Sequence, residues 1–274
     1  MYEKYILIFV IIVLIIVNQV RAEEFEGYAD KISIGGYTLA RYESAMSLTE
    51  PDFGSGLSVS PEDTLGLTTE QTVVRLDGVH RFNKSHALVY SWYAISSNGN
   101  KILDEEMDWL DEDGNQITIP AGAQVESVID YDIYKLGYFW SFYHSDKVEL
   151  SAGAGAHITR VGVRLNSDTT SSGVEARHVS TNFPLPVLSF AMKYHVTAKL
   201  FWYLKTEAFA LSFDNWEGTY TDSTAGLEYH VLDNIGLGAG LGSNALKLTE
   251  KDSEYKFTFD NRISGAVFYV AVYF

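Results

Sequence analysis

The densest group of side chains that could do chemistry is an acidic stretch between residues 104 and 113. Carboxylate oxygens are the ligands that hard divalent cations such as Ca²⁺ and Mg²⁺ prefer. The segment D-E-D-G-N at 111–115 matches only a fragment of a calcium loop and lacks the bidentate Glu at its far end. The stretch is therefore either a cation site or a solvated loop. Its seven carboxylates belong to Asp104, Glu105, Glu106, Asp108, Asp111, Glu112 and Asp113.

The usual arrangements for nucleophilic catalysis are missing from the sequence. The chain has no Cys and no G-x-S-x-G motif, and the pair His157 and Thr159 has no Ser nucleophile beside it. A hydrolase of this kind needs a nucleophile, a base and an acid within hydrogen-bond reach. We therefore predict no enzymatic activity and no cofactor, and keep a lipid hydrolase or a protease as an alternative.

A second set of charged side chains alternates with apolar ones along much of the chain. Its basic and acidic members are nearly equal in number, which predicts ion pairs between neighbouring strands. We expect these residues to form a charge network in the interior of the fold; alternatively, they line a narrow path for ions or small solutes. The set consists of Arg75, Asp77, Arg81, Lys135, Glu149, His157, Lys193, Lys205, Glu207, Glu228, Lys256, Asp260 and Arg262.

The segments that carry these charges alternate with a period of two, which is strand geometry. Leu136, Tyr138 and Trp140, for example, alternate with Gly137 and Ser141. The same pattern recurs ten times, which predicts five antiparallel hairpins. Eight strands is the alternative, if one long hairpin has been divided wrongly.

The connections between these segments differ in length. Tight turns near 83–86, 144–147, 197 and 232–234 alternate with longer polar loops near 49–69, 97–122 and 165–182. Short turns at one end and longer loops at the other are typical of an up-and-down transmembrane β-barrel.

A soluble β-sandwich or lipocalin-like barrel would show the same alternation with its apolar face inward. Aromatic side chains at the ends of the predicted strands favour the membrane barrel, because aromatic girdles lie at membrane interfaces. These aromatic residues are Phe82, Tyr90, Trp92, Trp140, Phe142, Trp202 and Tyr229.

The last ten residues, G-A-V-F-Y-V-A-V-Y-F, form an aromatic strand that ends on Phe274. Phe268, Val270, Val272 and Phe274 share one face of it, and Gly265 is a candidate bulge. This segment resembles the C-terminal strand of bacterial outer-membrane proteins, which closes the barrel against the first strand. The resemblance implies a small OmpA/OmpX-like barrel in the outer membrane, monomeric, with membrane lipid and lipopolysaccharide as partners.

Ten-stranded outer-membrane barrels include the omptin proteases, whose active site resembles paired acids on one strand facing an Asp-x-His on another. Asp130-Tyr131-Asp132 matches the first half of this pattern. The chain has no Asp-x-His; the nearest match, Glu228-Tyr229-His230, lies beside a tight turn at the wrong end of the barrel. The sequence therefore does not favour an omptin-like protease.

The N-terminus is typical of a secretory signal peptide. Lys4 precedes the apolar run 5–17, and V-R-A at 20–22 resembles a cleavage site. We expect residues 1–22 to be a signal peptide, residues 23–34 a periplasmic lead-in, and residues 35–274 the barrel, with no further soluble domain.

The charge balance limits the partners. With 20 basic and 36 acidic residues, the formal net charge is −16, which argues against nucleic acid because binding there requires Lys and Arg to neutralise phosphates. It suits divalent cations at the acidic loop, shared with lipopolysaccharide phosphates. The expected function is structural or adhesive, through the loops, with a narrow channel as the alternative.

Overall fold

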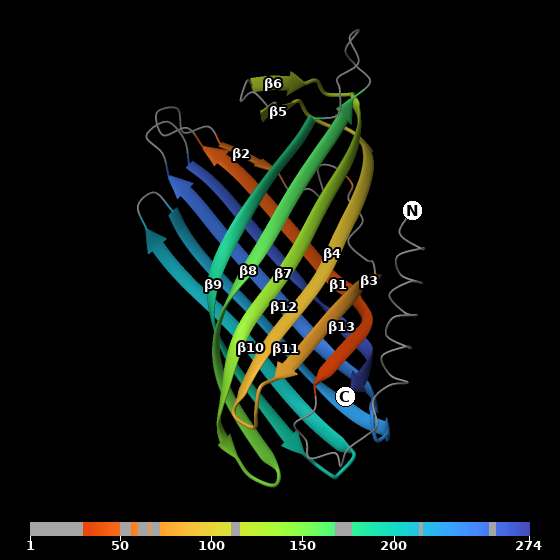
Figure 1. The fold of residues 1–274 in the computed structure, drawn as a ribbon. Coiled ribbons are helices and arrows are strands. Elements are labelled where there is room, and N and C mark those ends of the chain that lie inside the picture. Colours follow the sequence, from red (N-terminus) through yellow and green to blue (C-terminus); the bar gives the residue numbers. More distant parts are fainter. Residues whose placement is uncertain are drawn as a thin grey trace.

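A computed structural model of the chain describes residues 30–49, 56–59, 66, 72–110, 116–167, 177–213, 216–251 and 256–274. Ten long strands form a barrel (Figure 1). They are β1 (Lys31–Thr49), β3 (Thr72–Arg81), β4 (His86–Ile102), β7 (Gln124–His144), β8 (Val148–Ser167), β9 (Arg177–His195), β10 (Leu200–Phe213), β11 (Trp216–Leu232), β12 (Ile235–Lys251) and β13 (Lys256–Tyr273). The short strands are β2 (Gly56–Val59), β5 (Met107–Leu110) and β6 (Gln116–Ile119).

The barrel closes where β13 pairs with β1. Every barrel strand is antiparallel to its neighbours, and the β1–β13 register runs from Lys31 opposite Tyr273 to Thr49 opposite Lys256. Phe268, Val270 and Val272 are opposite Gly36, Ile34 and Ile32. The prediction of a closed ten-stranded antiparallel barrel is confirmed, and the eight-stranded alternative is wrong.

The bulge near Gly265 lies on the partner strand. The register shifts between Leu39 and Arg41, so Ala40 is the extra residue, next to the pair of Leu39 and Gly265. A Cβ on Gly265 would collide with the backbone of Thr38. Gly265 therefore lets β1 approach closely at the point where its faces switch.

The two ends of the barrel differ as the connection lengths predict. At one end, which we call the turn end, successive strands join through residues 82–85, 145–147, 196–199 and 233–234. Asp30 and Phe274 exchange two backbone hydrogen bonds of 3.0 Å at this end. The opposite end, the loop end, carries β2 and the β5–β6 hairpin (Figure 1).

Several strands extend further than the sequence pattern indicates. β1 begins at Lys31, so residues 31–34 of the expected lead-in pair with β13 and belong to the barrel. β4 continues to Ile102, and β5 and β6 form a hairpin within the connection expected as a loop at 97–122. The expected signal peptide, 1–22, lies outside the described residues. Among the described residues no helix has the length and apolarity of a membrane span.

About halfway up the barrel the chemical character of its two faces reverses. In the turn-end half the outward side chains are mostly apolar, whereas in the loop-end half the apolar side chains point into the lumen. On β7, Leu136 and Trp140 in the turn-end half point outward and are more than half exposed, while Lys135, next to Leu136, is buried in the lumen. In the loop-end half, Tyr131 and Ile133 point inward and are 1% exposed. The outer face is therefore apolar in the turn-end half and polar in the loop-end half.

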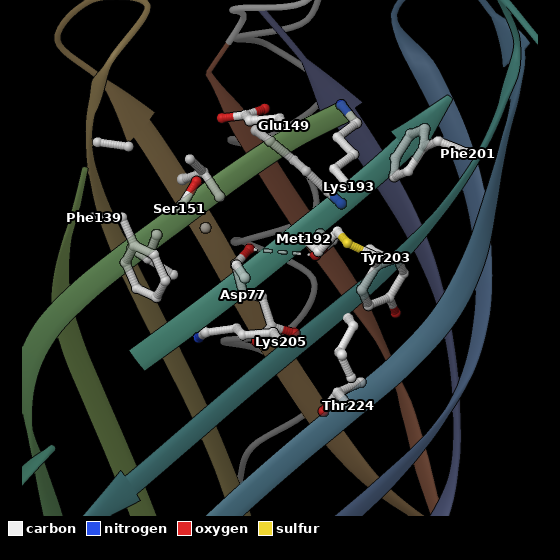
Figure 2. Close-up of a pocket in the computed structure, with 18 of the residues that line it drawn as sticks. Asp77, Phe139, Glu149, Ser151, Met192, Lys193, Phe201, Tyr203, Lys205 and Thr224 are labelled. Carbon is white, nitrogen blue, oxygen red and sulfur yellow. Dashed lines mark hydrogen bonds between the residues drawn. The ribbon is translucent and has the colours of Figure 1, made fainter. Parts of the chain in front are cut away.

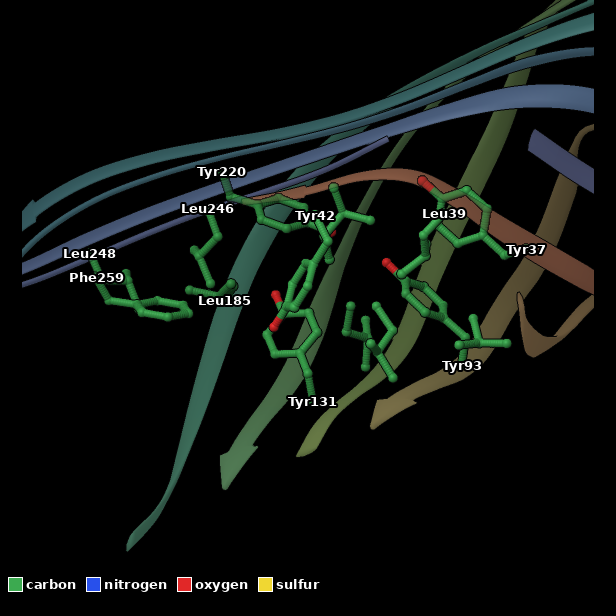
Figure 3. Packing of buried hydrophobic residues seen from close by; sticks show 14 of the residues in the cluster. Tyr37, Leu39, Tyr42, Tyr93, Tyr131, Leu185, Tyr220, Leu246, Leu248 and Phe259 are labelled. Atoms are coloured by element: carbon green, nitrogen blue, oxygen red, sulfur yellow. The ribbon is translucent and has the colours of Figure 1, made fainter. Parts of the chain in front are cut away.

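The hydrophobic core lies in the lumen of the loop-end half (Figure 3). Because the outer face of this half is polar, apolar side chains pack inside it, as in a soluble barrel. Figure 3 shows rings and aliphatic chains from strands on several sides of the barrel meeting there. The labelled members are Tyr37, Leu39, Tyr42, Tyr93, Tyr131, Leu185, Tyr220, Leu246, Leu248 and Phe259.

This exchange of faces corrects two of the expected lumen residues. Asp260 and Arg262 lie in the loop-end half of β13 and point outward, because Phe259, Asn261 and Ile263, which alternate with them, occupy the lumen positions. Arg262 is 61% exposed and its Nε lies 3.4 Å from Asp260. Lys256 lies near the loop end of the same strand, and its side chain is outside the described part.

Candidate functional site

A largely buried charge cluster crosses the middle of the lumen. The Lys135 ammonium on β7 lies 3.0 Å from Glu207 on β10 and 2.7 Å from Asp222 on β11. His157 Nε2 on β8 lies 3.3 Å from the same Glu207 oxygen, and Lys205 Nζ lies 2.9 Å from the other. We call these five residues the central cluster.

Neutral groups complete the central cluster. Asn244 Nδ2 on β12 donates to Asp222 at 3.0 Å and to the Tyr220 hydroxyl at 2.8 Å, and that hydroxyl donates to Asp222 at 3.3 Å. A charge withdrawn from water is costly unless it is paired and hydrogen-bonded. Side chains from β7, β8, β10, β11 and β12 provide this pairing and hydrogen bonding. The central cluster therefore holds opposite sides of the barrel together.

A second group of ion pairs lies nearer the turn end. Arg75 Nε lies 2.9 Å from Asp77, and Arg81 Nη2 lies 2.8 Å from Glu149. Because both pairs are partly shielded from water, they are screened less than surface pairs. The first pair lies within β3, and the second joins β3 to β8 across the lumen.

Glu228 on β11 is the most connected carboxylate of this half, and it is 0% exposed. Lys31 Nζ lies 2.6 Å from it, and the hydroxyls of Tyr269 and Tyr273 donate hydrogen bonds to its two oxygens. Lys31 belongs to β1 and both tyrosines to β13. Glu228 therefore binds the two strands whose pairing closes the barrel.

A cavity of about 240 Å³ lies between the central cluster and the turn end. Figure 2 shows Asp77, Glu149, Lys193 and Lys205 around it, together with aromatic rings such as that of Phe201. The cavity extends down to Lys31, whose side chain is 20% exposed. It is thus a space within the barrel whose walls carry both charged and apolar groups.

Most of the charged residues expected in the lumen are found there. The ten that line or occupy it are Arg75, Asp77, Arg81, Lys135, Glu149, His157, Lys193, Lys205, Glu207 and Glu228. The structure adds Lys31 and Asp222, which the sequence analysis missed. Asp222 shares the lumen face of β11 with Tyr220 and Thr224, so an extension of the period-two pattern toward the loop end would have found it.

The acidic stretch does not form a metal site in the described part of the chain. Asp104, Glu105 and Glu106 are exposed, and Lys101 Nζ lies 3.1 Å from Asp104. The described residues contain no group of three or more His, Asp or Glu side chains placed to hold a metal ion. Asp111, Glu112 and Asp113 lie outside the described residues, as does the side chain of Asp108.

The residues considered for hydrolysis are also separated. Asp130 points outward, where it accepts hydrogen bonds from Ser96 at 2.7 Å and from Arg164 at 2.8 Å. Glu228 and His230 point into the lumen near the turn end. His157 and Thr159 are buried in the lumen rather than on the lipid-facing wall that a lipid hydrolase would use.

Comparisons with known proteins agree with the architecture. No protein-family model matches the chain, and no curated protein matches it. The outer membrane protease OmpT from Escherichia coli has a TM-score of 0.58 and 10% identity, over 93% of this chain and 99% of that one. The translocator domain of the autotransporter NalP from Neisseria meningitidis has a TM-score of 0.44 and 8% identity, over 95% and 92%. OprG from Pseudomonas aeruginosa has a TM-score of 0.36 and 10% identity, over 90% and 96%.

At 10% identity, the similarity to OmpT concerns the fold and not the activity. The pairing of β13 with β1, the alternating turn and loop ends and the outward apolar face agree with it. The chain therefore has the closed ten-stranded fold of the small bacterial outer-membrane β-barrel proteins.

Proposed function

We propose that this protein is an outer-membrane barrel with an obstructed lumen, and that it has a structural or surface-interaction role carried by its loop end. One observation carries the proposal: the hydrophobic core and the central cluster fill successive levels of the same lumen. The Lys135 side chain is 3% exposed, and Val125 and Leu246 above it are 0% exposed. Packing of this kind leaves little room for a file of water molecules.

The outer apolar belt has the height of a membrane. On β7 the outward residues from Tyr134 to Phe142 are aromatic or aliphatic. Nine residues rise about 30 Å along a strand, or about 23 Å along an axis tilted by about 40°, close to the apolar band of about 25 Å in outer-membrane barrels. In the proposed orientation the turn end faces the periplasm, after secretion by the signal peptide, and the loop end faces outward.

Charged side chains begin on the outer face directly beyond this belt. The Arg160 guanidinium lies 5.3 Å from the ring centre of Tyr134, which is the β7 residue of the belt nearest the loop end. Arg41 and Arg262 are both more than 60% exposed. These groups suit contact with lipid headgroups or lipopolysaccharide phosphates, and the acidic stretch at 104–113 suits divalent cations between them. A monomer is sufficient for this arrangement.

The separation of the candidate catalytic groups supports a non-enzymatic role. Asp130 is on the outer face and paired with Arg164, while Glu228 is in the lumen near the turn end. An acid–base pair must share a reacting atom within hydrogen-bond reach. These two carboxylates have no position of that kind in common.

Single-channel recording of the refolded mature protein in planar bilayers tests the proposal. A heat-modifiability gel shift on the same sample shows that the barrel has formed. A folded barrel that stays silent supports the structural or surface role. Steady conductance that changes in Arg75→Gln or Glu207→Gln, but not in the exposed control Glu217→Gln, would instead establish a narrow channel.

A further inference from the structure

Lys193 is the charged residue of the lumen that lacks an ion-pair partner in the described part of the chain. Its ammonium lies 4.2 Å from the ring centre of Phe201. Glu149 is opposite Lys193 in the β8–β9 register, but its salt bridge is with Arg81. The other lumen cations each have a carboxylate within 3.1 Å: Lys31, Arg75, Arg81, Lys135 and Lys205.

The lumen therefore has one positive charge in excess. Six described Lys and Arg side chains face five carboxylates, those of Asp77, Glu149, Glu207, Asp222 and Glu228. The excess is notable because acidic residues outnumber basic ones in the whole chain, 36 to 20. A shielded charge without a counterion is unfavourable, and an anion that supplied the missing charge would be stabilised there.

An unsatisfied buried donor lines the same cavity. Arg81 donates to Glu149 through Nη2, but its Nη1 is buried without a hydrogen-bond partner. A buried donor left unpaired also costs free energy. Lys193 and Arg81 thus offer two donors, on β9 and β3, to an acceptor that the chain itself does not provide.

The remaining walls indicate what the acceptor is attached to. Phe139, Phe201 and Val267 line the cavity and are at most 5% exposed. Figure 2 shows the rings of Phe139, Phe201 and Tyr203 around the charged groups. Cavities that combine apolar walls with a few converging polar groups are typical small-molecule sites. A volume of about 240 Å³ suits a compact organic ligand.

We propose that this cavity binds a small organic carboxylate from the turn end, with its charge beside Lys193 and Arg81 and its apolar group against the aromatic walls. The site is independent of the proposed function of the loop end, because it lies on the turn-end side of the central cluster. Its occupation supplies the sixth negative charge of the lumen.

Binding of benzoate to the refolded full barrel, in a nonionic detergent, tests this inference by calorimetric titration. Benzyl alcohol has the ring without the charge, and inorganic phosphate has charge without the ring. We expect benzoate to bind at least about tenfold more tightly than either compound, because a charge-assisted hydrogen bond is stronger than a neutral one. Equal affinity for benzyl alcohol, equal affinity for phosphate, or no binding of benzoate would overturn the proposal.

Lys193→Met removes the ammonium and keeps an unbranched side chain of similar length. We expect it to weaken benzoate at least about tenfold. The matched control, Lys199→Met in an exposed turn, should bind as the wild type does. Lys193→Gln provides a second variant, and the gel shift confirms that each variant has folded. Unchanged binding in a folded Lys193 variant contradicts the site, whereas the conductance experiment separately tests the obstructed lumen.

Discussion

The Tyr269 hydroxyl donates a hydrogen bond of 2.7 Å to Oε2 of Glu228. This bond joins β13 to β11 across the intervening strand β12. Lys31 on β1 reaches the same oxygen at 2.6 Å. One buried carboxylate therefore connects the first and last strands of the barrel through side chains, in addition to their backbone pairing.

Replacement of Glu228 by Gln should destabilise the barrel at its closing strands. The amide keeps the shape of the side chain but removes the charge that Lys31, Tyr269 and Tyr273 surround. We expect the free energy of unfolding to fall by about 3 kcal/mol, as for other broken buried pairs. Urea unfolding in lipid vesicles measures it. Glu217→Gln on the same strand removes an exposed pair with Lys251, and a loss below about 1 kcal/mol is expected there.

Lys135→Met should leave Glu207 and Asp222 without their shared cation. Both carboxylates are buried, and removing one partner of such a cluster costs about 3–5 kcal/mol. The same unfolding measurement applies, with Lys199→Met as the exposed control. A Lys135→Met barrel as stable as the wild type would show that the central cluster is not required for stability.

Two substitutions on β11 test the position of the membrane. Leu227 and Thr221 both point outward, but Leu227 lies in the apolar turn-end half and Thr221 in the polar half. Leu227→Arg should cost about 2–4 kcal/mol in lipid vesicles, since a charge on the lipid face is unfavourable near the bilayer midplane. Thr221→Arg should cost about 0–1 kcal/mol. Equal costs at the two positions would place the membrane boundary elsewhere.

Gly238 provides a steric test of the contact between Tyr269 and Glu228. A Cβ at this position would collide with the Tyr269 ring, which lies directly over the glycine. Gly238→Val should therefore displace the ring and weaken its hydrogen bond to Glu228, lowering stability by about 1–3 kcal/mol, as for other overpacked sites. Gly137→Ala is the control, because its Cβ would lie 3.3 Å from the flexible end of Phe139. The temperature of the gel shift reports both changes.

The architecture could be predicted because a strand in lipid must follow strict rules. Leu237 and Leu241 alternate with glycines, and backbone pairing in a membrane leaves a closed barrel as the solution. The tight turns near 83–86 and 232–234 then fixed the order of the hairpins. These local patterns require no knowledge of distant contacts.

The candidate site could be predicted only in part, because the environment of the outer face changes along each strand. Asp260 and Arg262 continue the alternation of Phe268 and Val270, yet they meet water instead of lipid. Nothing in a period of two marks where the membrane ends. The partners of Glu228 and the lack of a partner for Lys193 likewise depend on which strands face each other across the lumen, and a sequence does not show those distances.

The exchange of faces halfway up each strand also determines how deeply the barrel sits in its bilayer. Movement toward the periplasm would bring Arg160 and Asp132 into hydrocarbon, and movement outward would expose Leu136 and Trp140 to water. Both displacements are unfavourable, so a thinner or thicker bilayer must deform around the protein instead of letting it slide. The barrel therefore has a preferred membrane thickness. This thickness is set by the level on each strand at which the outward-facing side chains change from apolar to polar.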